Sequence, residues 1–336
     1  MENKNTISKR KRDHIDLSFQ SQVNSDKPDA RFYYEPLMGN PGDIDLSLQF
    51  AGYDFDAPIW ISSMTGGTVF SSKINENLAK IANKFNLGLG LGSCRQLLDS
   101  DEYLNDFNVR KYIGERPLFA NLGIAQVEQL IKNGQVNKIH ELIKKLDADG
   151  LIIHINPMQE FIQPEGDIIS VKPIDTIKKL LNKTGLSIIV KEVGQGMGIK
   201  SLTELMALPL TAIEFGAFGG TNFTKLELLR SNDVKYKQNF SLINIGHNAE
   251  EMIDFIEKIK SEKNNKINCN NFIISGGIKD YLDGYYLTEK LSFTSLYGMA
   301  SRFLKPAMEG YEELEKFVEK HIEGLKIAKA YLKIKK

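Results

Sequence analysis

From Ala57 onward, short apolar runs alternate with longer segments in which apolar residues recur at helical spacing. Short apolar runs bounded by polar residues are typical of buried parallel strands. The spacing of Ile74, Leu78, Ile81, Ala82 and Phe85 predicts an amphipathic helix over 73–85, and similar helices fit between the other runs. The predicted strands are 58–63, 87–92, 117–122, 150–155, 187–192, 211–216, 271–275 and 294–299.

Eight strand–helix units favour a single closed (β/α)8 TIM barrel, because alternating strands and helices form right-handed parallel crossovers. A doubly wound sheet would normally use fewer strands and place its glycine fingerprint first. We therefore expect an α/β protein with an N-terminal arm and barrel-capping segment over 1–56 and the barrel over 57–336. The weakest unit lies between 217 and 270, where the polar insertion 231–248 predicts a lid or an irregular loop.

The first 56 residues are polar and rich in Asp, Asn, Pro and Gly, which predicts an irregular, mobile arm. Lys9, Arg10, Lys11 and Arg12 form a basic cluster in it, and His14 follows. Such a cluster is most often only a solvated charge run. It could also be a nucleic-acid or targeting tag, or an arm that folds over an anionic ligand.

The overall charge balance excludes a global attraction to nucleic acid or to an anionic membrane. The 336 residues include 43 lysines and arginines and 43 acidic residues, and 42% of the chain is hydrophobic. Two cysteines, Cys94 and Cys269, are too few for a disulfide framework and fit a reducing compartment. No signal peptide or membrane-length apolar run is apparent, so we expect a soluble cytoplasmic protein.

The candidate chemistry centres on the stretch 154–167, which follows a predicted strand. His154 interrupts the apolar run of that strand, and Pro157 prevents the strand from continuing. Asn156, Gln159 and Glu160 add two amides and a carboxylate within six residues of the histidine. Barrels keep their catalytic groups just beyond the carboxyl ends of strands, although a polar strand cap would look similar.

Other predicted strand ends carry groups that suit an anionic, planar ligand. Lys191 lies in an otherwise apolar run, where a lysine is rare unless it is paired or functional. Arg95 carries a guanidinium group that can bind an anion through two parallel hydrogen bonds. Glycines end the last two strands, which in this fold form the usual phosphate cradle. Together these features suit a phosphorylated planar cofactor such as flavin mononucleotide (FMN).

With these motifs in view, the sequence resembles the flavin-dependent type 2 isopentenyl diphosphate isomerases over nearly its whole length. The resemblance implies a (β/α)8 barrel that binds FMN and Mg2+, takes NADPH as reductant, forms a homo-oligomer (tetramer or octamer) and interconverts isopentenyl and dimethylallyl diphosphate. The motifs that carry it are Arg10-Lys11 with His14-Ile15, 63–67, Gly92-Ser93 with Arg95, Asn121, 154–160 with 163–167, 191–194, 219–221 and 275–278.

By matching position, the resemblance also implies residue roles. It gives Gln159, His154 and Lys191 to catalysis and Glu160 to Mg2+. The implied substrate contacts are Arg10, Lys11, His14, Ser93, Cys94, Arg95, His154, Asn156 and Gln159. The implied FMN contacts are Ser62, Ser63, Met64, Thr65, Ser93, Asn121, Lys191, Gly216, Thr221, Gly276, Gly277, Ile278, Lys279, Gly298, Met299 and Ala300.

The sequence departs from the family pattern at several of these positions. Cys94 stands where glutamine is common, and Gly216 stands where a serine often offers a hydroxyl to the flavin. Lys279 and Tyr281 replace an arginine and a glycine. The stretch 245–247 also differs from the tryptophan-containing pattern usual there. These departures bear on FMN affinity more than on fold or reaction.

Two other functions are compatible with a flavin barrel. An FMN-dependent 2-hydroxy acid oxidase or dehydrogenase would need a histidine base and an arginine pair late in the chain. Only His247 lies between the sixth and seventh predicted strands, and no arginine is near it. A non-catalytic flavin-binding protein would leave the cluster at Gln159 and Glu160 unexplained. The isomerase function is therefore favoured.

Overall fold

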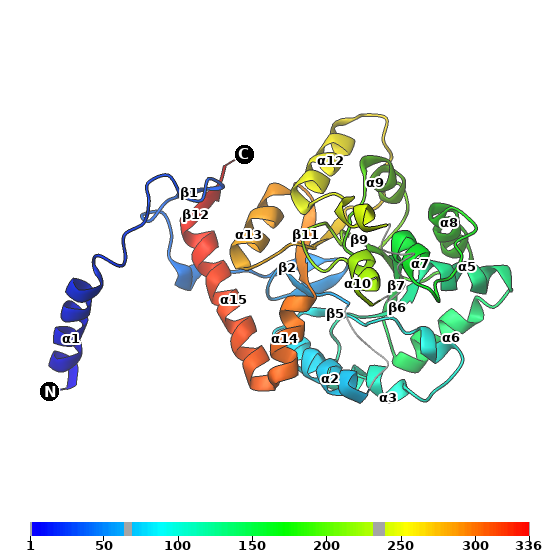
Figure 1. The fold of residues 1–336 in the computed structure, drawn as a ribbon, viewed down its shortest axis with the longest axis horizontal. Helices are drawn as coiled ribbons and strands as arrows, with labels where there is room; N and C mark the ends of the chain where they lie inside the picture. Colours follow the sequence, from blue (N-terminus) through cyan, green and yellow to red (C-terminus); the bar gives the residue numbers. More distant parts are fainter. Residues whose placement is uncertain (1, 64–68, 231–238, 336) are drawn as a thin grey trace.

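A computed structural model describes residues 2–63, 69–230 and 239–335. The eight predicted strands form one closed parallel barrel, and each strand pairs with its neighbour in chain order until the last returns to the first (Figure 1). The predicted fold is thus confirmed. The barrel strands are β4 Ile59–Ile61, β5 Gly88–Gly90, β6 Leu118–Gly123, β7 Gly150–Ile155, β8 Ile188–Glu192, β9 Ala212–Glu214, β10 Asn271–Ser275 and β11 Thr294–Met299.

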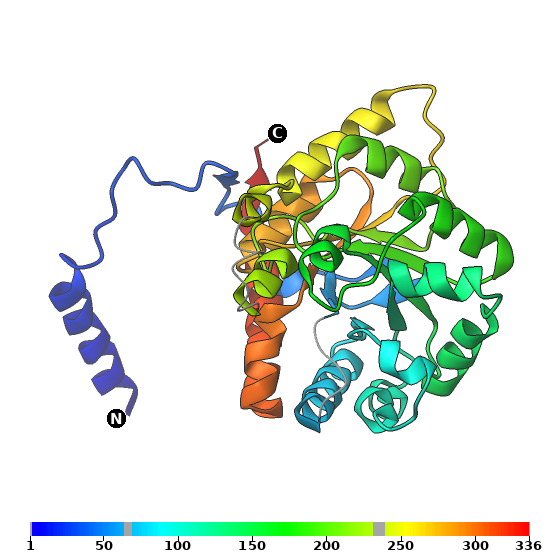
Figure 2. The same cartoon turned by 45° about the vertical axis from the view of Figure 1, so that its right-hand side comes forward.

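Helices surround the barrel on its outside (Figures 1 and 2). The helix predicted over 73–85 is α2, Val69–Lys84, which begins four residues earlier and buries Ile74, Leu78 and Ile81 as expected. The other helices of the barrel layer are α3 Leu104–Phe107, α4 Arg110–Ile113, α5 Ile124–Lys132, α6 Asn137–Leu146, α7 Pro157–Ile162, α8 Pro173–Lys183, α9 Ile199–Met206, α10 Phe223–Arg230, α12 Ala249–Ser261, α13 Tyr281–Lys290, α14 Ser301–Glu309 and α15 Tyr311–Tyr331.

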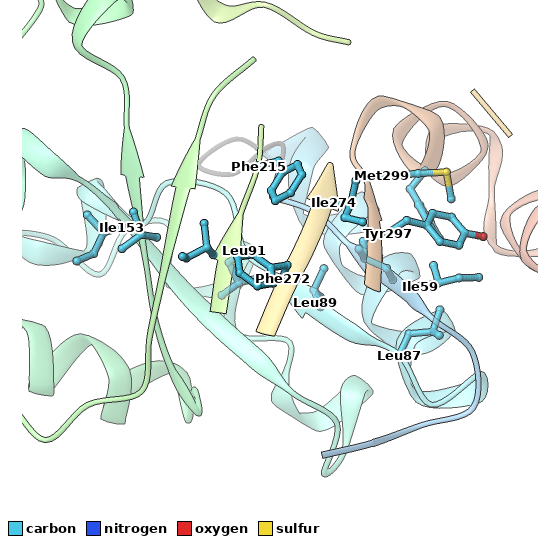
Figure 3. Packing of buried hydrophobic residues seen from close by; sticks show 14 of the residues in the cluster. Ile59, Leu87, Leu89, Leu91, Ile153, Phe215, Phe272, Ile274, Tyr297 and Met299 are labelled. Atoms are coloured by element: carbon cyan, nitrogen blue, oxygen red, sulfur yellow. The ribbon is translucent and has the colours of Figure 1, made fainter. Parts of the chain in front are cut away.

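The hydrophobic core has two parts because each strand is covered on both faces. The larger part lies between the barrel and its helices, and Figure 3 shows Phe272, Ile274 and Tyr297 packed within it. The smaller part fills the barrel interior with side chains such as Ile152, Ile189 and Leu296. The barrel is therefore a filled core, and its chemistry must lie at the strand ends.

A short antiparallel hairpin contributes to the interior core. Its strands are β2, Leu48–Phe50, and β3, Tyr53–Phe55. Phe50 and Phe55 meet edge to face and belong to the same cluster as Trp60 and Phe119 of the barrel strands. The hairpin immediately precedes β4, so the capping segment expected over 1–56 contributes large aromatic side chains to the barrel core.

The expectation of an irregular N-terminal arm is wrong for its first part. Residues Glu2–Leu17 form the helix α1, which stands apart from the barrel in both views (Figures 1 and 2). The prolines and glycines of the arm begin only at Pro28, so nothing in the basic stretch breaks a helix. Arg12 and Asp16 add an i,i+4 ion pair at 3.8 Å.

A small two-stranded sheet joins the arm to the C-terminal end of the chain. Strand β1, Phe32–Tyr34, pairs antiparallel with β12, Leu332–Ile334, which directly follows α15. The short 3-10 helix η1, Pro41–Asp43, then contacts α15. The root of the arm is thereby fixed to the C-terminal end of the chain.

Much of the predicted insertion, 231–238, lies outside the described residues. The rest is more regular than expected, because residues Phe240–Asn244 form the 3-10 helix η3, which contacts α10. A further 3-10 helix, η2, spans Arg95–Leu98. Within the described ranges, no helix combines the length and the apolar character needed to cross a membrane.

We predict that Phe55→Ala destabilises the protein by about 3–5 kcal/mol, because it leaves a cavity beneath Trp60 and Phe119 where the wild-type ring is 1% exposed. Urea denaturation followed by circular dichroism measures the change. Phe19→Ala is the matched control, since that ring is 83% exposed in the arm. Equal stability of the Phe55 variant and the wild type would show that the hairpin does not contribute to the barrel core.

Candidate active site

A cavity opens at the carboxyl ends of β4 and β8 to β11. Charged, hydroxyl and glycine residues share its wall, as the ring of strand ends predicts. The lining residues are Ser62, Ser63, Lys191–Gly194, Glu214, Gly216, Gly219–Thr221, Phe223, Ser275–Lys279 and Gly298–Arg302.

One end of the cavity is built from backbone that suits a phosphate. Gly276 and Gly277 have φ values of 94° and 77°, and a side chain at Gly276 would meet the carbonyl oxygen of Ala217 at 2.0 Å. Helix α14 begins beside them at Ser301 and has no side-chain cap. Its first amide groups are therefore available to an anion, whereas those of α13 are capped by Asp280.

Lys191 projects from β8 into the same cavity and is 7% exposed. Its ammonium group donates to the carbonyl oxygen of Glu192 at 3.2 Å. In register beside it lie His154 on β7 and Glu214 on β9. A buried cation with one protein acceptor can stabilise negative charge on a ligand in this cavity.

Other polar atoms in the cavity wall also have unused hydrogen-bonding capacity. The hydroxyl of Ser63 and one oxygen of Glu214 are buried without a hydrogen-bond partner among the described residues. Burial raises the pKa of the Glu214 carboxyl, and the Lys191 charge opposes that shift. Buried polar groups are normally satisfied, so these atoms fit a polar ligand seated against β4 and β9.

His154 is held as a neutral imidazole with a defined tautomer. The amide nitrogen of Asn121 donates to the Leu91 carbonyl at 2.9 Å, which turns its oxygen toward His154 Nδ1 at 2.8 Å. That oxygen can only accept, so Nδ1 carries the proton and Nε2 keeps its lone pair. Burial, together with the Lys191 charge, lowers the pKa of His154 to about 3.

The residues that follow β7 form a connected network on α7. The amide of Asn156 donates to Gln159 Oε1 at 3.2 Å and to Glu160 Oε1 at 2.9 Å. Glu160 Oε2 accepts the backbone N–H of Asp167 at 2.7 Å. Pro157 starts the helix and Asn156 precedes it, so the local sequence brings two amides and a carboxylate together.

Arg95 joins this network from the start of η2, which follows β5, two strands away from β7 in the barrel. Its guanidinium pairs with Asp167 at 2.7 Å while about half of the side chain stays exposed. Gln126 donates to the same carboxylate at 2.7 Å. Cys94, by contrast, points into the core with no exposed surface, and burial raises the pKa of its thiol to about 12.

Three residues of this network, Gln126, Glu227 and Arg230, were not predicted from the sequence. Glu227, on the buried face of α10, is 3% exposed and accepts the side-chain amide of Gln159 at 3.2 Å. Arg230, one turn later, lies 3.1 Å from its other oxygen. A buried carboxylate is unusual, but the sequence alone carries no signal for it, because its burial and its contact with Gln159 appear only in the folded chain.

Comparison with known proteins identifies the family of this barrel. No family model matches the sequence. The isopentenyl-diphosphate delta-isomerase of Rickettsia felis is 32% identical over 331 residues, which cover 97% of this chain and 92% of the relative. The enzyme of the same name from Nostoc sp. is 34% identical, and the aligned residues cover 92% of this chain and 87% of the relative. The chain belongs to the isopentenyl-diphosphate delta-isomerase family. The resemblance to its type 2 members is confirmed.

Solved structures with a similar fold come from other proteins at low identity. A mandelate oxidase mutant with an FMN adduct superposes with a TM-score of 0.58 at 9% identity, over 91% of this chain and 88% of its own. A flavocytochrome b2 mutant with bound pyruvate superposes with a TM-score of 0.62 at 13% identity. The match covers 89% of this chain and 71% of the flavocytochrome chain. At such identities the likeness shows the barrel fold alone.

The structure of this isomerase family member brings many predicted cofactor residues to one cavity: Ser62, Ser63, Lys191, Gly216, Thr221, Gly276–Lys279 and Gly298–Ala300. Within the described ranges, Ser93 and Asn121 are absent from that lining. Met64 and Thr65 lie outside the described residues. The assigned roles themselves stay predictions.

The predicted substrate residues of the arm are not brought to the site. Arg10, Lys11 and His14 lie on α1, exposed and away from the barrel (Figure 2). His154, Asn156, Gln159 and Arg95 do gather near one another at the ends of β7 and β5. The diphosphate role of the arm thus requires α1 to move or to meet another subunit.

Two departures from the family pattern have local explanations. Gly216 has a φ of 53°, and a side chain there would meet the Glu192 carbonyl oxygen at 2.1 Å, so this backbone has no room for serine. His247 pairs with Glu251 at 2.9 Å and lies edge-on to Phe255, both on α12. It does not line the cavity, which argues against the histidine base that an oxidase would need.

We predict that the His154 imidazole stays neutral, with its proton on Nδ1, down to pH 5. Its pKa is about 3 when folded and about 6.5 when unfolded, so the unfolded state binds more protons between these values and stability falls as the pH is lowered through this window. Nitrogen-15 NMR of the imidazoles tests this directly. A protonated His154 at pH 6 would contradict it.

Proposed function

We propose that the protein interconverts isopentenyl diphosphate and dimethylallyl diphosphate with reduced FMN and Mg2+. The observation that carries the proposal is Lys191, a buried cation in a cavity wall that also contains the unpartnered hydroxyl of Ser63 and two glycine-rich strand ends. Family membership supports the reaction, since the relatives from Rickettsia and Nostoc bear the name of that isomerase.

The residues of the cavity fit an FMN molecule. The Gly276–Lys279 backbone and the uncapped start of α14 would hold its phosphate, and Ser62, Ser63 and Lys191 would contact its ring system. When bound and reduced, FMN supplies the proton donor and acceptor that isomerisation needs. Lys191 would stabilise negative charge on the reduced ring because its position is fixed before the ligand arrives.

The network on α7 fits a diphosphate that carries its own metal. Among the described residues, no group of three or more His, Cys, Asp or Glu side chains could hold a metal ion. Mg2+ is commonly held by one or two carboxylates together with substrate phosphates and water. Glu160 would supply that carboxylate, and Arg95 would neutralise charge on the diphosphate. Asn156 would keep Glu160 oriented through their 2.9 Å hydrogen bond.

The remaining groups act by orientation rather than by proton transfer of their own. His154 offers a neutral Nε2 to the substrate because Asn121 fixes its tautomer. Gln159, held between Asn156 and Glu227, would face the hydrocarbon end of the substrate. Arg10, Lys11 and His14 would close over the diphosphate. NADPH as reductant, a homo-oligomer and a cytoplasmic location complete the proposal.

We predict that turnover requires reduced FMN, because the groups placed next to the substrate, His154, Asn156, Gln159 and Glu160, are a neutral histidine, two amides and a metal-binding carboxylate and form no acid–base pair. Enzyme reconstituted with FMN should be nearly silent in air and active after dithionite treatment. Product formation from isopentenyl diphosphate is followed by mass spectrometry. Equal turnover by the oxidised enzyme would contradict the prediction.

We predict that Glu160→Gln raises the Mg2+ concentration needed for half-maximal rate at least tenfold, because the change removes the charge that the metal needs while keeping the side-chain shape. Bound FMN should be unaffected. Titration of the activity with Mg2+ under reducing conditions measures the shift.

Gln159→Asn is the matched variant on the same helix. Shortening the amide should lower kcat by up to about a hundredfold, because a hydrogen-bonding group at the reacting centre is displaced. Its Mg2+ requirement should stay near that of the wild type. If the metal requirement changed in the Gln159 variant and not in the Glu160 variant, the two roles would be assigned to the wrong residues.

A further inference from the structure

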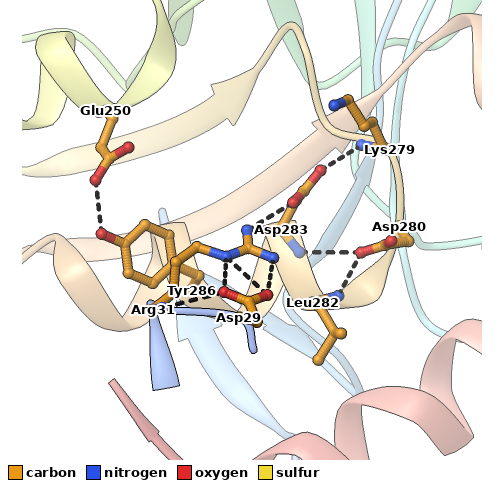
Figure 4. A network of polar contacts seen from close by, with 8 residues as sticks. All are labelled: Asp29, Arg31, Glu250, Lys279, Asp280, Leu282, Asp283 and Tyr286. Atoms are coloured by element: carbon orange, nitrogen blue, oxygen red, sulfur yellow. Dashed lines mark hydrogen bonds and ion pairs between the residues drawn. The ribbon is translucent and has the colours of Figure 1, made fainter. Parts of the chain in front are cut away.

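The carboxylate of Asp283 joins two parts of the molecule that are far apart in sequence (Figure 4). Asp283 lies in the first turn of α13. One of its oxygens accepts the backbone N–H of Lys279 at 2.9 Å. The other accepts the guanidinium of Arg31, at the root of the N-terminal arm, at 2.7 Å. A single side chain thus contacts both the cavity loop and the arm.

The Lys279 contact lies at the phosphate end of the cavity. The loop 275–279 lines that cavity, and its two glycines lie in the left-handed region of φ. Glycines leave a loop free to take many conformations, so an external hydrogen bond has a large effect on which one is populated. Asp283 supplies such a bond from the rigid first turn of α13.

The Arg31 contact is held from several sides. Asp29 accepts from Arg31 Nε and Nη2 at 2.9 Å and 2.7 Å. The guanidinium also lies over the rings of Phe32 and Tyr286, 5.2 Å and 5.3 Å from their centroids. Arg31 immediately precedes β1, so its position is fixed by the small sheet with β12. It can therefore orient the Asp283 carboxylate.

We propose that Asp283 is a positioning residue that, together with Arg31, holds the loop 275–279 in the conformation that receives the FMN phosphate. Neither residue lines the cavity, so both act through the backbone of Lys279. Because binding and conformation are linked, occupation of the cavity should in turn strengthen the attachment of the arm root. The inference rests on the proposed use of FMN.

The test compares FMN with riboflavin, which lacks the phosphate, by fluorescence titration of full-length apoprotein. In Asp283→Ala, the loss of a charged hydrogen bond to the loop should raise the Kd for FMN about tenfold. The Kd for riboflavin should change by less than about twofold, because the loop meets only the phosphate. A purely structural role would weaken both ligands alike.

Three variants separate the two contacts of Asp283. In Asp283→Asn the side-chain oxygen can still accept from Lys279 while the ion pair is lost, so FMN binding should weaken only about threefold. Arg31→Ala should weaken FMN binding to the same extent as Asp283→Asn. The double variant Arg31→Ala/Asp283→Ala should be no weaker than Asp283→Ala alone, because Arg31 acts through that carboxylate.

Glu250→Ala is the control on the neighbouring helix α12, which packs against α13. It removes contacts of 2.6 Å and 3.0 Å to Tyr286 and Lys290 but leaves the Asp283 carboxylate untouched (Figure 4). Its FMN affinity should equal that of the wild type. If Asp283→Ala bound FMN as tightly as the wild type, with an unchanged ratio of the Kd values for FMN and riboflavin, the inference would be overturned while the proposed function still stood. A wild-type protein that binds neither flavin would overturn the proposed function as well.

Discussion

The structure of the site depends on the burial of one cation, Lys191, in a barrel strand. Removing an ammonium group from water is costly unless acceptors and opposite charge are at hand. The Glu192 carbonyl and the Glu214 carboxylate on the next strand supply part of that compensation. The same positive charge helps to keep His154 neutral on the other side. An anionic ligand would complete the balance.

The parallel barrel brings together the groups that compensate the Lys191 charge. All eight strands run in one direction, so groups that are distant in sequence meet at their carboxyl ends. Lys191 and Glu214 come from adjacent strands, and the loops after β9 and β10 approach closely at Gly220 and Gly277. The network of Asn156, Gln159 and Glu160 lies at the end of β7 and takes no part in the barrel core.

The barrel could be predicted because its signal is local and repeated. Each strand is an apolar run, and helix α2 follows from the spacing of its apolar residues alone. Strands β1 and β12 could not be predicted, since each has three residues and exists only through pairing with a partner about 300 residues away. Helix α1 was not predicted because the proline and glycine content was considered for all 56 residues of the arm together, whereas the first 27 residues contain neither.

The candidate site was predictable to the extent that polar residues interrupt strands. His154 and Lys191 stand out in apolar runs. Glu227 did not, because one acidic residue on an amphipathic helix is ordinary until its burial and its contact with Gln159 are known. The strain that excludes a side chain at Gly216 depends on the approach of the Glu192 carbonyl, which only the folded chain reveals.

A crystal structure of the full chain grown with FMN tests the central claim most directly. The account predicts the flavin across the carboxyl ends of the strands, with its ring beside Lys191 and its phosphate between Gly277 and the start of α14. An FMN phosphate bound at Arg95, or a flavin outside this cavity, would contradict the account.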